Sequence, residues 1–211
     1  MAKRGGASWR RRETLDPAFQ QAKKLGYRSR ASLKLLEINQ RAQLFKRGDW
    51  VLDLGAAPGG WSQVALELAG AKQLAGPNRI IGVDLLPIKP LQGVSFLQGD
   101  FTSAGIQQKI QELLPDSGVQ LVISDMAPNI SGIRAKDQAD SLMLADWALE
   151  ASLKHLVKGG HFLVKLFQGP DVEAYGKKVK AEFGQIRWLK PKSSRSDSSE
   201  VYLLGKNRRL D

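Results

Sequence analysis

The chain has 211 residues, of which 42% are hydrophobic, and this is enough for one α/β domain with a substantial core. Lys and Arg outnumber Asp and Glu by 32 to 21, and the net charge of +11 favours a polyanion such as nucleic acid as the partner. With no cysteine and only two histidines, the sequence excludes disulfides, thiol nucleophiles and multi-histidine metal sites, so we expect no metal cofactor.

The N-terminal segment is basic and poor in large apolar residues. Lys3, Arg4 and the run Arg10–Arg12 lie mainly among glycine, alanine and serine, a composition that cannot bury enough surface to fold alone. We predict a flexible basic arm over residues 1–18, which either contacts RNA phosphates or is simply a disordered end. Residues 19–211 are predicted to form a single domain.

A helix is predicted between Arg28 and Arg41, because leucine and isoleucine recur there at helical spacing. Lys34 lies between two leucines of this segment. The pattern alone favours a place on the polar face of the helix for this lysine, and a functional role is the alternative.

The segment from Trp50 to Leu68 reads as a strand, a glycine-rich turn and a helix. Such a unit builds a nucleotide-sized crevice at the carboxyl end of a sheet. In the turn, Ala57 replaces the middle glycine of a dinucleotide fingerprint, and Pro58 removes a backbone N–H that could bind a phosphate. The turn therefore suits a ligand without phosphates, and we expect S-adenosylmethionine; an ordinary glycine turn is the alternative.

Strands and helices alternate through most of the remaining chain, as is typical of a doubly wound parallel sheet. The predicted strands are residues 50–54, 79–84, 94–98, 119–124 and 161–167, and the predicted helices are residues 60–69, 103–114, 137–157 and 171–182. Two further strands, residues 183–190 and 200–205, have no helix between them and should pair antiparallel. The predicted fold is a Rossmann-like methyltransferase fold, with a mostly parallel seven-stranded sheet and an antiparallel C-terminal hairpin.

Three aspartates terminate otherwise apolar strands, where ligands of such sheets bind. Asp84 is placed to accept hydrogen bonds from a ribose diol, and Asp100 to meet the exocyclic amine of adenine. Asp125 ends the fourth strand. The alternative for each is an N-cap on a following helix, and for Asp100 the two interpretations are nearly balanced.

Lys165 lies inside the otherwise apolar strand Phe162–Phe167. An unpaired buried ammonium would be very costly, so this lysine needs carboxylates nearby. Asp125, at the end of the adjacent strand, and Glu200, at the start of the last strand, are the candidates. The alternative is an edge lysine whose amino group reaches solvent.

Five motifs occur together and in order. They are Arg28-Ser-Arg-Ala-Ser-Leu-Lys-Leu, Asp53-Leu-Gly-Ala-Ala-Pro-Gly-Gly-Trp-Ser-Gln, Ser124-Asp-Met-Ala-Pro-Asn, Val164-Lys-Leu-Phe-Gln-Gly and Ser193-Ser-Arg-Ser-Asp-Ser-Ser-Glu-Val-Tyr. Through them, the chain from about residue 19 to about residue 205 resembles the FtsJ-type RNA ribose 2′-O-methyltransferases. Within that family it is most similar to the bacterial enzymes that act on large-subunit ribosomal RNA, although the connection at residues 71–78 is longer than expected for them.

The resemblance implies two sets of site residues. The implied catalytic residues are Lys34, Asp125, Lys165 and Glu200. The implied contacts to S-adenosylmethionine are Gly55, Gly59, Trp61, Asp84, Asp100 and Asp125. We expect Lys165 to contact the ribose 2′-hydroxyl, with Asp125 and Glu200 orienting it and Lys34 helping to hold the hydroxyl.

The function implied by the resemblance is 2′-O-methylation of a uridine ribose in 23S, or large-subunit, ribosomal RNA, with the assembled large subunit as the expected substrate. No apolar run approaches the roughly 20 residues of a membrane span, and the start lacks the apolar core of a signal peptide. We therefore expect a cytoplasmic protein, and we expect it to be a monomer.

Three other functions share part of this pattern. A non-catalytic, cofactor-binding RNA chaperone or assembly factor would keep the turn and the charge, but it would not need paired lysines and acids around the crevice. A methyltransferase of proteins or small molecules would gain nothing from the charge. A nicotinamide oxidoreductase is disfavoured by Pro58 and by the missing middle glycine.

Overall fold

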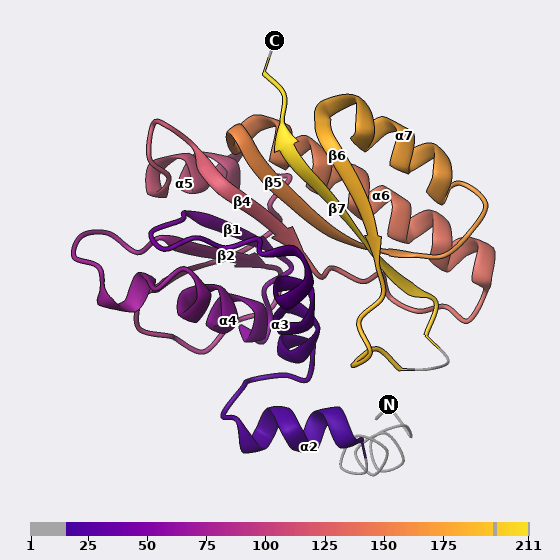
Figure 1. Ribbon diagram of the computed structural model, residues 1–211, viewed down its shortest axis with the longest axis horizontal. Helices are drawn as coiled ribbons and strands as arrows, with labels where there is room; N and C mark the ends of the chain where they lie inside the picture. Colours follow the sequence, from indigo (N-terminus) through magenta and orange to yellow (C-terminus); the bar gives the residue numbers. More distant parts are fainter. Residues whose placement is uncertain (1–15, 196–197, 211) are drawn as a thin grey trace.

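The computed structural model describes residues 16–195 and 198–210, which form one seven-stranded sheet with helices on both sides (Figure 1). The strand order is β3-β2-β1-β4-β5-β7-β6. In chain order the strands are β1 (Val51–Leu54), β2 (Ile80–Asp84), β3 (Val94–Gln98), β4 (Val119–Ser124), β5 (Leu156–Phe167), β6 (Phe183–Leu189) and β7 (Glu200–Arg208). The first five strands pair in parallel, and β7 pairs antiparallel with both β5 and β6. The predicted fold is confirmed.

The helices cover the sheet in two layers (Figure 1). One face packs against α3 (Ala31–Ala42) and α4 (Gly60–Leu68), and the other packs against α5 (Ala104–Leu113), α6 (Arg134–His155) and α7 (Val172–Glu182). Successive side chains of β5 point to opposite faces of the sheet, so the strand packs against both helix layers. Leu163 packs on the α3 side, while Val164 and Leu166 pack on the α6 side.

The sheet reverses its winding between β1 and β4, which are direct neighbours. Strand β1 leads into α4 on one face, and β4 leads into α6 on the other. A crevice opens outside the carboxyl ends of the strands at such a switch point, because the two connections leave in opposite directions. The switch point therefore decides where a ligand can bind.

Strand β5 begins at Leu156, five residues earlier than predicted, and α6 ends at His155 instead of continuing to residue 157. The predicted helix end was wrong because Leu156 already pairs with Val119 of β4, and Gly159 and Gly160 lie in this early part of the strand. Gly159 has a φ of +79°, which favours glycine, and a side chain on Gly160 would crowd the carbonyl oxygen of Val157. The register with β4 also shifts between Val119 and Leu121.

Helix α2 (Pro17–Lys24) was not predicted. Its start is well specified locally, because Pro17 occupies the first turn and the Asp16 carboxylate accepts the backbone N–H groups of Ala18 and Phe19 at 2.9 and 3.4 Å. Of the predicted arm, residues 1–15 lie outside the described residues, and Pro17 and Ala18 belong to this helix.

The hairpin connection between β6 and β7 is fixed against α3. The Glu37 carboxylate accepts the backbone N–H groups of Lys192 and Ser193 at 2.6 and 3.0 Å, and Arg30 donates to the Ser193 carbonyl at 2.6 Å. These hydrogen bonds position the start of β7 at the carboxyl end of the parallel strands. Glu200 is the first residue of β7. Among the described residues, no helix is both long and apolar enough to cross a membrane.

Candidate active site

A cleft of about 790 Å³ lies at the switch point between β1 and β4. It is bounded by the turn after β1, the ends of β2, β3 and β4, and one face of α6. Gly55 belongs to this wall, has a φ of +77°, and lies so close to Met126 that a Cβ there would be 3.2 Å from the Met126 Cα and nearer still to its Cγ. A glycine is required at this position on both counts.

Asp84 lines the cleft and holds the glycine-rich turn in place. One of its carboxylate oxygens accepts the Ala57 N–H at 2.9 Å, and the other accepts the Leu86 N–H at 2.8 Å. No helix follows Asp84, since the chain runs through a loop to β3, so the N-cap interpretation is wrong here. Each carboxylate oxygen keeps further lone pairs that a ligand hydroxyl could use.

Asp100 also lines the cleft, and its carboxylate accepts hydrogen bonds from Thr102, two residues further along the chain. One oxygen accepts the Thr102 N–H at 2.9 Å and the Thr102 hydroxyl at 2.7 Å. These hydrogen bonds lower the pKa of Asp100, because they favour its charged form. The N-cap of α5 is Ser103, so Asp100 forms a turn before the helix and does not cap it.

Asp125 joins this cleft to a buried lysine. The Lys165 amino group donates to the Asp125 carbonyl oxygen at 2.6 Å and lies 3.1 Å from the Asp125 carboxylate. The Lys165 residue is only 6% exposed, so the edge-lysine interpretation is wrong, and the predicted partnership with Asp125 is present. No helix follows Asp125 before Arg134, which also excludes an N-cap role.

Lys34 is buried as well, with 6% of its surface exposed, so the predicted place on the polar face of its helix was wrong. Its amino group lies 2.6 Å from the Glu200 carboxylate and 5.8 Å from the centre of the Tyr202 ring. Glu200 was expected to neutralise Lys165 together with Asp125, but its ion pair is with Lys34. Each lysine thus has a carboxylate of its own.

Tyr202 connects the two ion pairs and was missed by the sequence analysis. Its hydroxyl donates to the Asp125 carboxylate at 2.7 Å, and its Cα pairs with that of Lys165 across β5 and β7. Burial, followed by the charges of Asp125 and Glu200, raises the pKa of Tyr202 well above its usual value, so the hydroxyl stays protonated. Its spacing of two residues from Glu200 on one strand was the signal that could have identified it.

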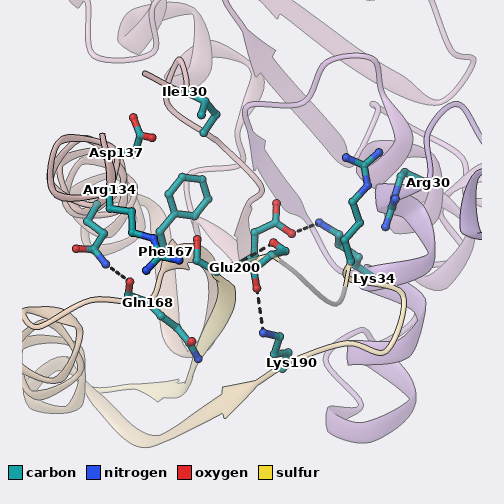
Figure 2. Close-up of a pocket in the computed structure, with 13 residues that line it drawn as sticks. Arg30, Lys34, Ile130, Arg134, Asp137, Phe167, Gln168, Lys190 and Glu200 are labelled. Carbon is teal, nitrogen blue, oxygen red and sulfur yellow. Dashed lines mark hydrogen bonds and ion pairs between the residues drawn. The ribbon is translucent and has the colours of Figure 1, made fainter. Parts of the chain in front are cut away.

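A second pocket of about 910 Å³ opens on the other side of this cluster. Figure 2 shows Lys34 and Arg30 on one wall, Phe167 and Ile130 on the opposite wall, and Glu200 between them. Most of its lining side chains are charged or polar, and the cationic ones are Arg30, Lys34, Arg134, Lys190 and Arg195. Such a wall favours an anionic ligand that is larger than a single ion.

Comparison with known proteins places this geometry in a family. The sequence profile of the FtsJ-like methyltransferases matches residues 27–208. The chain belongs to the FtsJ-like methyltransferase family. It is 48% identical over 202 residues to "Ribosomal RNA large subunit methyltransferase E" of Nitrosospira multiformis, with 96% of each chain covered. The protein of the same name from Coxiella burnetii is 48% identical over 200 residues, covering 93% of this chain and 92% of the relative.

A solved structure supports the same assignment. A Plasmodium falciparum protein named as a ribosomal RNA methyltransferase is 30% identical, with a TM-score of 0.76 over 86% of this chain and 98% of that one. The family resemblance inferred from the five motifs is therefore confirmed, and the protein is a methyltransferase by family.

The cleft is lined by some of the predicted cofactor contacts but not by all of them. Gly55, Asp84, Asp100 and Asp125 line it, whereas Gly59 and Trp61 are not among its lining residues. The Trp61 side chain is 3% exposed; its indole N–H donates to the Ala31 carbonyl at 2.8 Å, and its ring packs 5.8 Å from the ring of Tyr202. Its side chain is therefore engaged in packing α4 against α3 and β7.

Gly59 is the N-cap of α4, with a φ of +102°. A Cβ at this position would lie 2.8 Å from the Arg28 guanidinium, whose two terminal nitrogens donate to the carbonyl groups of Lys89 and Pro90. Gly59 thus lets Arg28 tie the segment before α3 to the loop after β2. A contact of Gly59 or Trp61 with the cofactor stays a prediction.

Asp53, the acidic residue of β1, is fully buried below the cleft. The Ser62 hydroxyl donates to one of its oxygens at 2.6 Å, and the other oxygen has no hydrogen-bond partner among the described residues. Burial, assisted by the nearby charges of Asp125 and Asp84, raises the pKa of Asp53 to about 7 despite the Ser62 hydrogen bond. Asp53 was assigned no role from the sequence, although an acid inside an apolar strand was a visible signal.

Proposed function

We propose that the protein transfers a methyl group from S-adenosylmethionine to the 2′-oxygen of a uridine ribose in 23S ribosomal RNA. The observation that carries the proposal is the position of the Lys165–Asp125–Tyr202–Glu200–Lys34 cluster. Asp125 lines the cleft at the switch point, and Lys34 and Glu200 line the basic pocket. The cluster therefore lies where a methyl donor in the cleft would meet an acceptor in the pocket.

The cleft fits an adenosyl group that carries an amino acid. Asp84 and Asp100 offer carboxylate oxygens to ribose hydroxyls and to an exocyclic amine, and the missing side chain of Gly55 leaves room beside Met126. Bound there, the cofactor supplies an electrophilic methyl group on a sulfonium. The rim contributes apolar surface for the adenine from Leu85, Leu86, Met143 and Trp147.

The cluster residues have separate tasks in the displacement. Lys165 is held by Asp125, whose carboxylate accepts the Tyr202 hydroxyl, and it orients the ribose 2′-hydroxyl in line with the methyl group. Lys34, held by Glu200, contacts the same hydroxyl from the pocket side. As the new O–C bond forms, the S–C bond would break with its electron pair staying on sulfur, and the hydroxyl proton passes to a carboxylate oxygen of the cluster, on Asp125 or Glu200.

The identity of the acceptor is supported by charge and by the relatives. The pocket walls are cationic, and phosphate contacts to Lys and Arg provide most of the affinity for RNA. The Nitrosospira multiformis and Coxiella burnetii relatives carry the name of large-subunit ribosomal RNA methyltransferases. We infer that the assembled large subunit is the substrate, which would place the protein in the cytoplasm.

Transfer of labelled methyl groups to undermethylated large subunits, free 23S RNA and a protein control tests the proposal. We expect label in the RNA of the subunits, and after alkaline digestion we expect it in a dinucleotide, because a 2′-O-methyl group blocks cleavage of the adjacent phosphodiester. Label in a mononucleotide would assign the reaction to a base, and label in protein would reject an RNA substrate. Binding of the cofactor without transfer to any acceptor would favour a non-catalytic assembly factor.

A further inference from the structure

The basic pocket contains two apolar side chains on one wall. Of the described residues that line it, Ile130 and Phe167 are the hydrophobic ones, and the others are charged, amide or hydroxyl residues. Figure 2 shows both on the wall opposite Lys34, with Glu200 between that wall and the lysine. An electrostatic contact to phosphates does not account for this wall, because neither side chain can pair with an anion.

Phe167 lies next to the catalytic cluster along the sheet. It is two residues after Lys165 on β5, which places it on the same face about 6.6 Å further along the strand. Its Cα pairs with that of Glu200, just as that of Lys165 pairs with that of Tyr202. A ribose whose 2′-hydroxyl contacts Lys165 would therefore have Phe167 within reach of its base, which is attached to the adjacent ring carbon.

The first turns of α6 hold this wall in place. The Ser141 hydroxyl accepts the backbone N–H of Phe167 at 3.0 Å. The Asp137 carboxylate accepts the backbone N–H and hydroxyl of Ser131 at 2.8 and 2.6 Å, which fixes the loop directly after Ile130. Ile130 is 66% exposed although its loop is anchored, so its apolar surface is presented to the pocket in a defined position.

We propose that Ile130 and Phe167 form the subsite for the nucleobase of the methylated nucleotide. The inference rests on the proposed function, since it takes the ribose to lie at Lys34 and Lys165. A base drawn out of an RNA strand needs a flat apolar contact to replace its lost stacking, and aromatic and aliphatic side chains provide it. The cationic residues around this wall, Arg134 among them, then face the flanking phosphates.

Saturation-transfer NMR with uridine 5′-monophosphate tests the subsite without requiring methyl transfer. We expect saturation of the uracil H5 and H6 protons by the wild-type protein, and at least about tenfold weaker binding of the nucleotide to Ile130→Ala. Ile133→Ala is the matched control, because Ile133 is 64% exposed on the same loop but does not line the pocket. Ribose 5-phosphate, which lacks the base, should bind all three proteins equally.

Phe167→Leu is the second variant. Leucine is chosen because Phe167 is only 8% exposed, and a smaller side chain would disturb the packing. It should keep its unfolding midpoint and lose uracil saturation. Saturation of ribose protons alone, or equal uracil signals from Ile130→Ala and Ile133→Ala, would overturn the subsite.

The proposed reaction is judged separately, by wild-type methyl transfer to large subunits. Normal transfer by the wild type with equal KM values for Ile130→Ala and Ile133→Ala would reject the base subsite alone. Uracil binding that depends on Ile130, without methyl transfer to RNA by the wild type, would support the subsite and reject the reaction.

Discussion

At the scale of single residues, the site is defined by charges that are buried and paired. Lys165 and Lys34 are each 6% exposed, and each lies within 3.1 Å of a carboxylate oxygen. Removing an ammonium from water is costly unless a partner and hydrogen bonds replace the water. The arrangement therefore fixes the Lys34 amino group in the wall of the basic pocket and the Lys165 amino group beside Asp125, which lines the cleft.

Replacing the Lys165 side chain should lower activity strongly without unfolding the protein. We expect Lys165→Met to lower the rate of methyl transfer by about 10²- to 10⁴-fold, because the 2′-hydroxyl loses the group that orients it. The affinity for S-adenosylmethionine, measured by calorimetry, should stay near the wild-type value. Lys178→Met is the control, since Lys178 forms an exposed ion pair with Asp146 away from the site. Equal rates for the two variants would reject the role of Lys165.

The raised pKa of Asp53 gives the protein a characteristic pH dependence. Because the folded-state pKa is about 7 and the ordinary value is 3.8, the folded chain holds a proton that the unfolded chain has released between these two values. The free energy of unfolding of the wild type should thus fall, relative to that of Asp53→Asn, as pH rises from about 4 to about 7, by at most about 1.4 kcal/mol per pH unit. Above pH 7 the difference should level off.

Urea unfolding of both proteins at pH 5 and pH 8 measures this difference. The comparison cancels the titration of all other groups, since asparagine does not ionise. A difference between the two proteins that is the same at both pH values would mean that Asp53 is already ionised at pH 5.

The members of the proposed catalytic cluster could be predicted from the sequence, except for Tyr202, but their pairing could not. A lysine in an apolar strand had to have a carboxylate, and Asp125 follows from strand adjacency. The partner of Glu200 could not be predicted, because it lies 166 positions away on a helix whose buried face was misassigned. Lys34 looked solvent-exposed because helical periodicity does not reveal that β7 covers that face of α3.

At the scale of elements, the turn after β1 shapes the cleft. Gly55 and Gly26 have nearly the same backbone conformation, with φ of +77° and +78°. A Cβ at Gly26 would meet nothing within 4 Å, whereas a Cβ at Gly55 would collide with Met126 at the end of β4. Substituting Gly26 therefore measures the free-energy cost of a side chain at positive φ alone. Substituting Gly55 adds the cost of a side chain in the cleft wall.

Alanine at each glycine should have different consequences. Both variants should lose roughly 1 kcal/mol of stability from the strained backbone. Gly55→Ala should lose more, and it should also bind S-adenosylmethionine more weakly, because Met126 must move. Thermal unfolding and calorimetric titration measure the two effects. If Gly26→Ala weakens cofactor binding as much as Gly55→Ala does, the turn does not form the cofactor wall.

Most elements were predictable because the apolar runs and glycine turns are local signals. Helix α2 was missed because its one buried residue, Ala22, gives no periodic apolar pattern, although Asp16 and Pro17 together mark a helix start. The early start of β5 was missed because the strand residues before His161 include two glycines, which look like a loop. Their strand conformation depends on pairing with β4, which is a tertiary effect.

At the scale of the whole molecule, two pockets open at the carboxyl end of the sheet. The cleft lies at the switch point, and the basic pocket lies between α3, the start of α6 and the β6–β7 connection. The connection is anchored by Glu37 and Arg30, so its cationic residues are held near Lys34. Among the described residues, five of the 32 Lys and Arg side chains line this pocket, against two acidic ones.

RNA affinity should fall steeply with salt, because each neutralised phosphate releases counterions. Titration of a labelled 23S RNA fragment at several salt concentrations should give a straight line of log affinity against log salt. Arg134→Ala should make the slope shallower by about one unit. Lys109→Ala, on the exposed side of α5, should leave it unchanged. A salt-independent affinity would remove the support that charge gives to an RNA substrate.

The central proposal is ribose methylation at a uridine by the Lys165–Asp125–Tyr202–Glu200–Lys34 cluster. Partial alkaline hydrolysis of 23S RNA, recovered from undermethylated large subunits after incubation with the protein and S-adenosylmethionine, is its sharpest test. We expect one new gap in the hydrolysis ladder, next to a uridine, which is absent when Lys165→Met replaces the wild type. An unchanged ladder beside methyl label in the RNA, or a gap that persists with Lys165→Met, would contradict it.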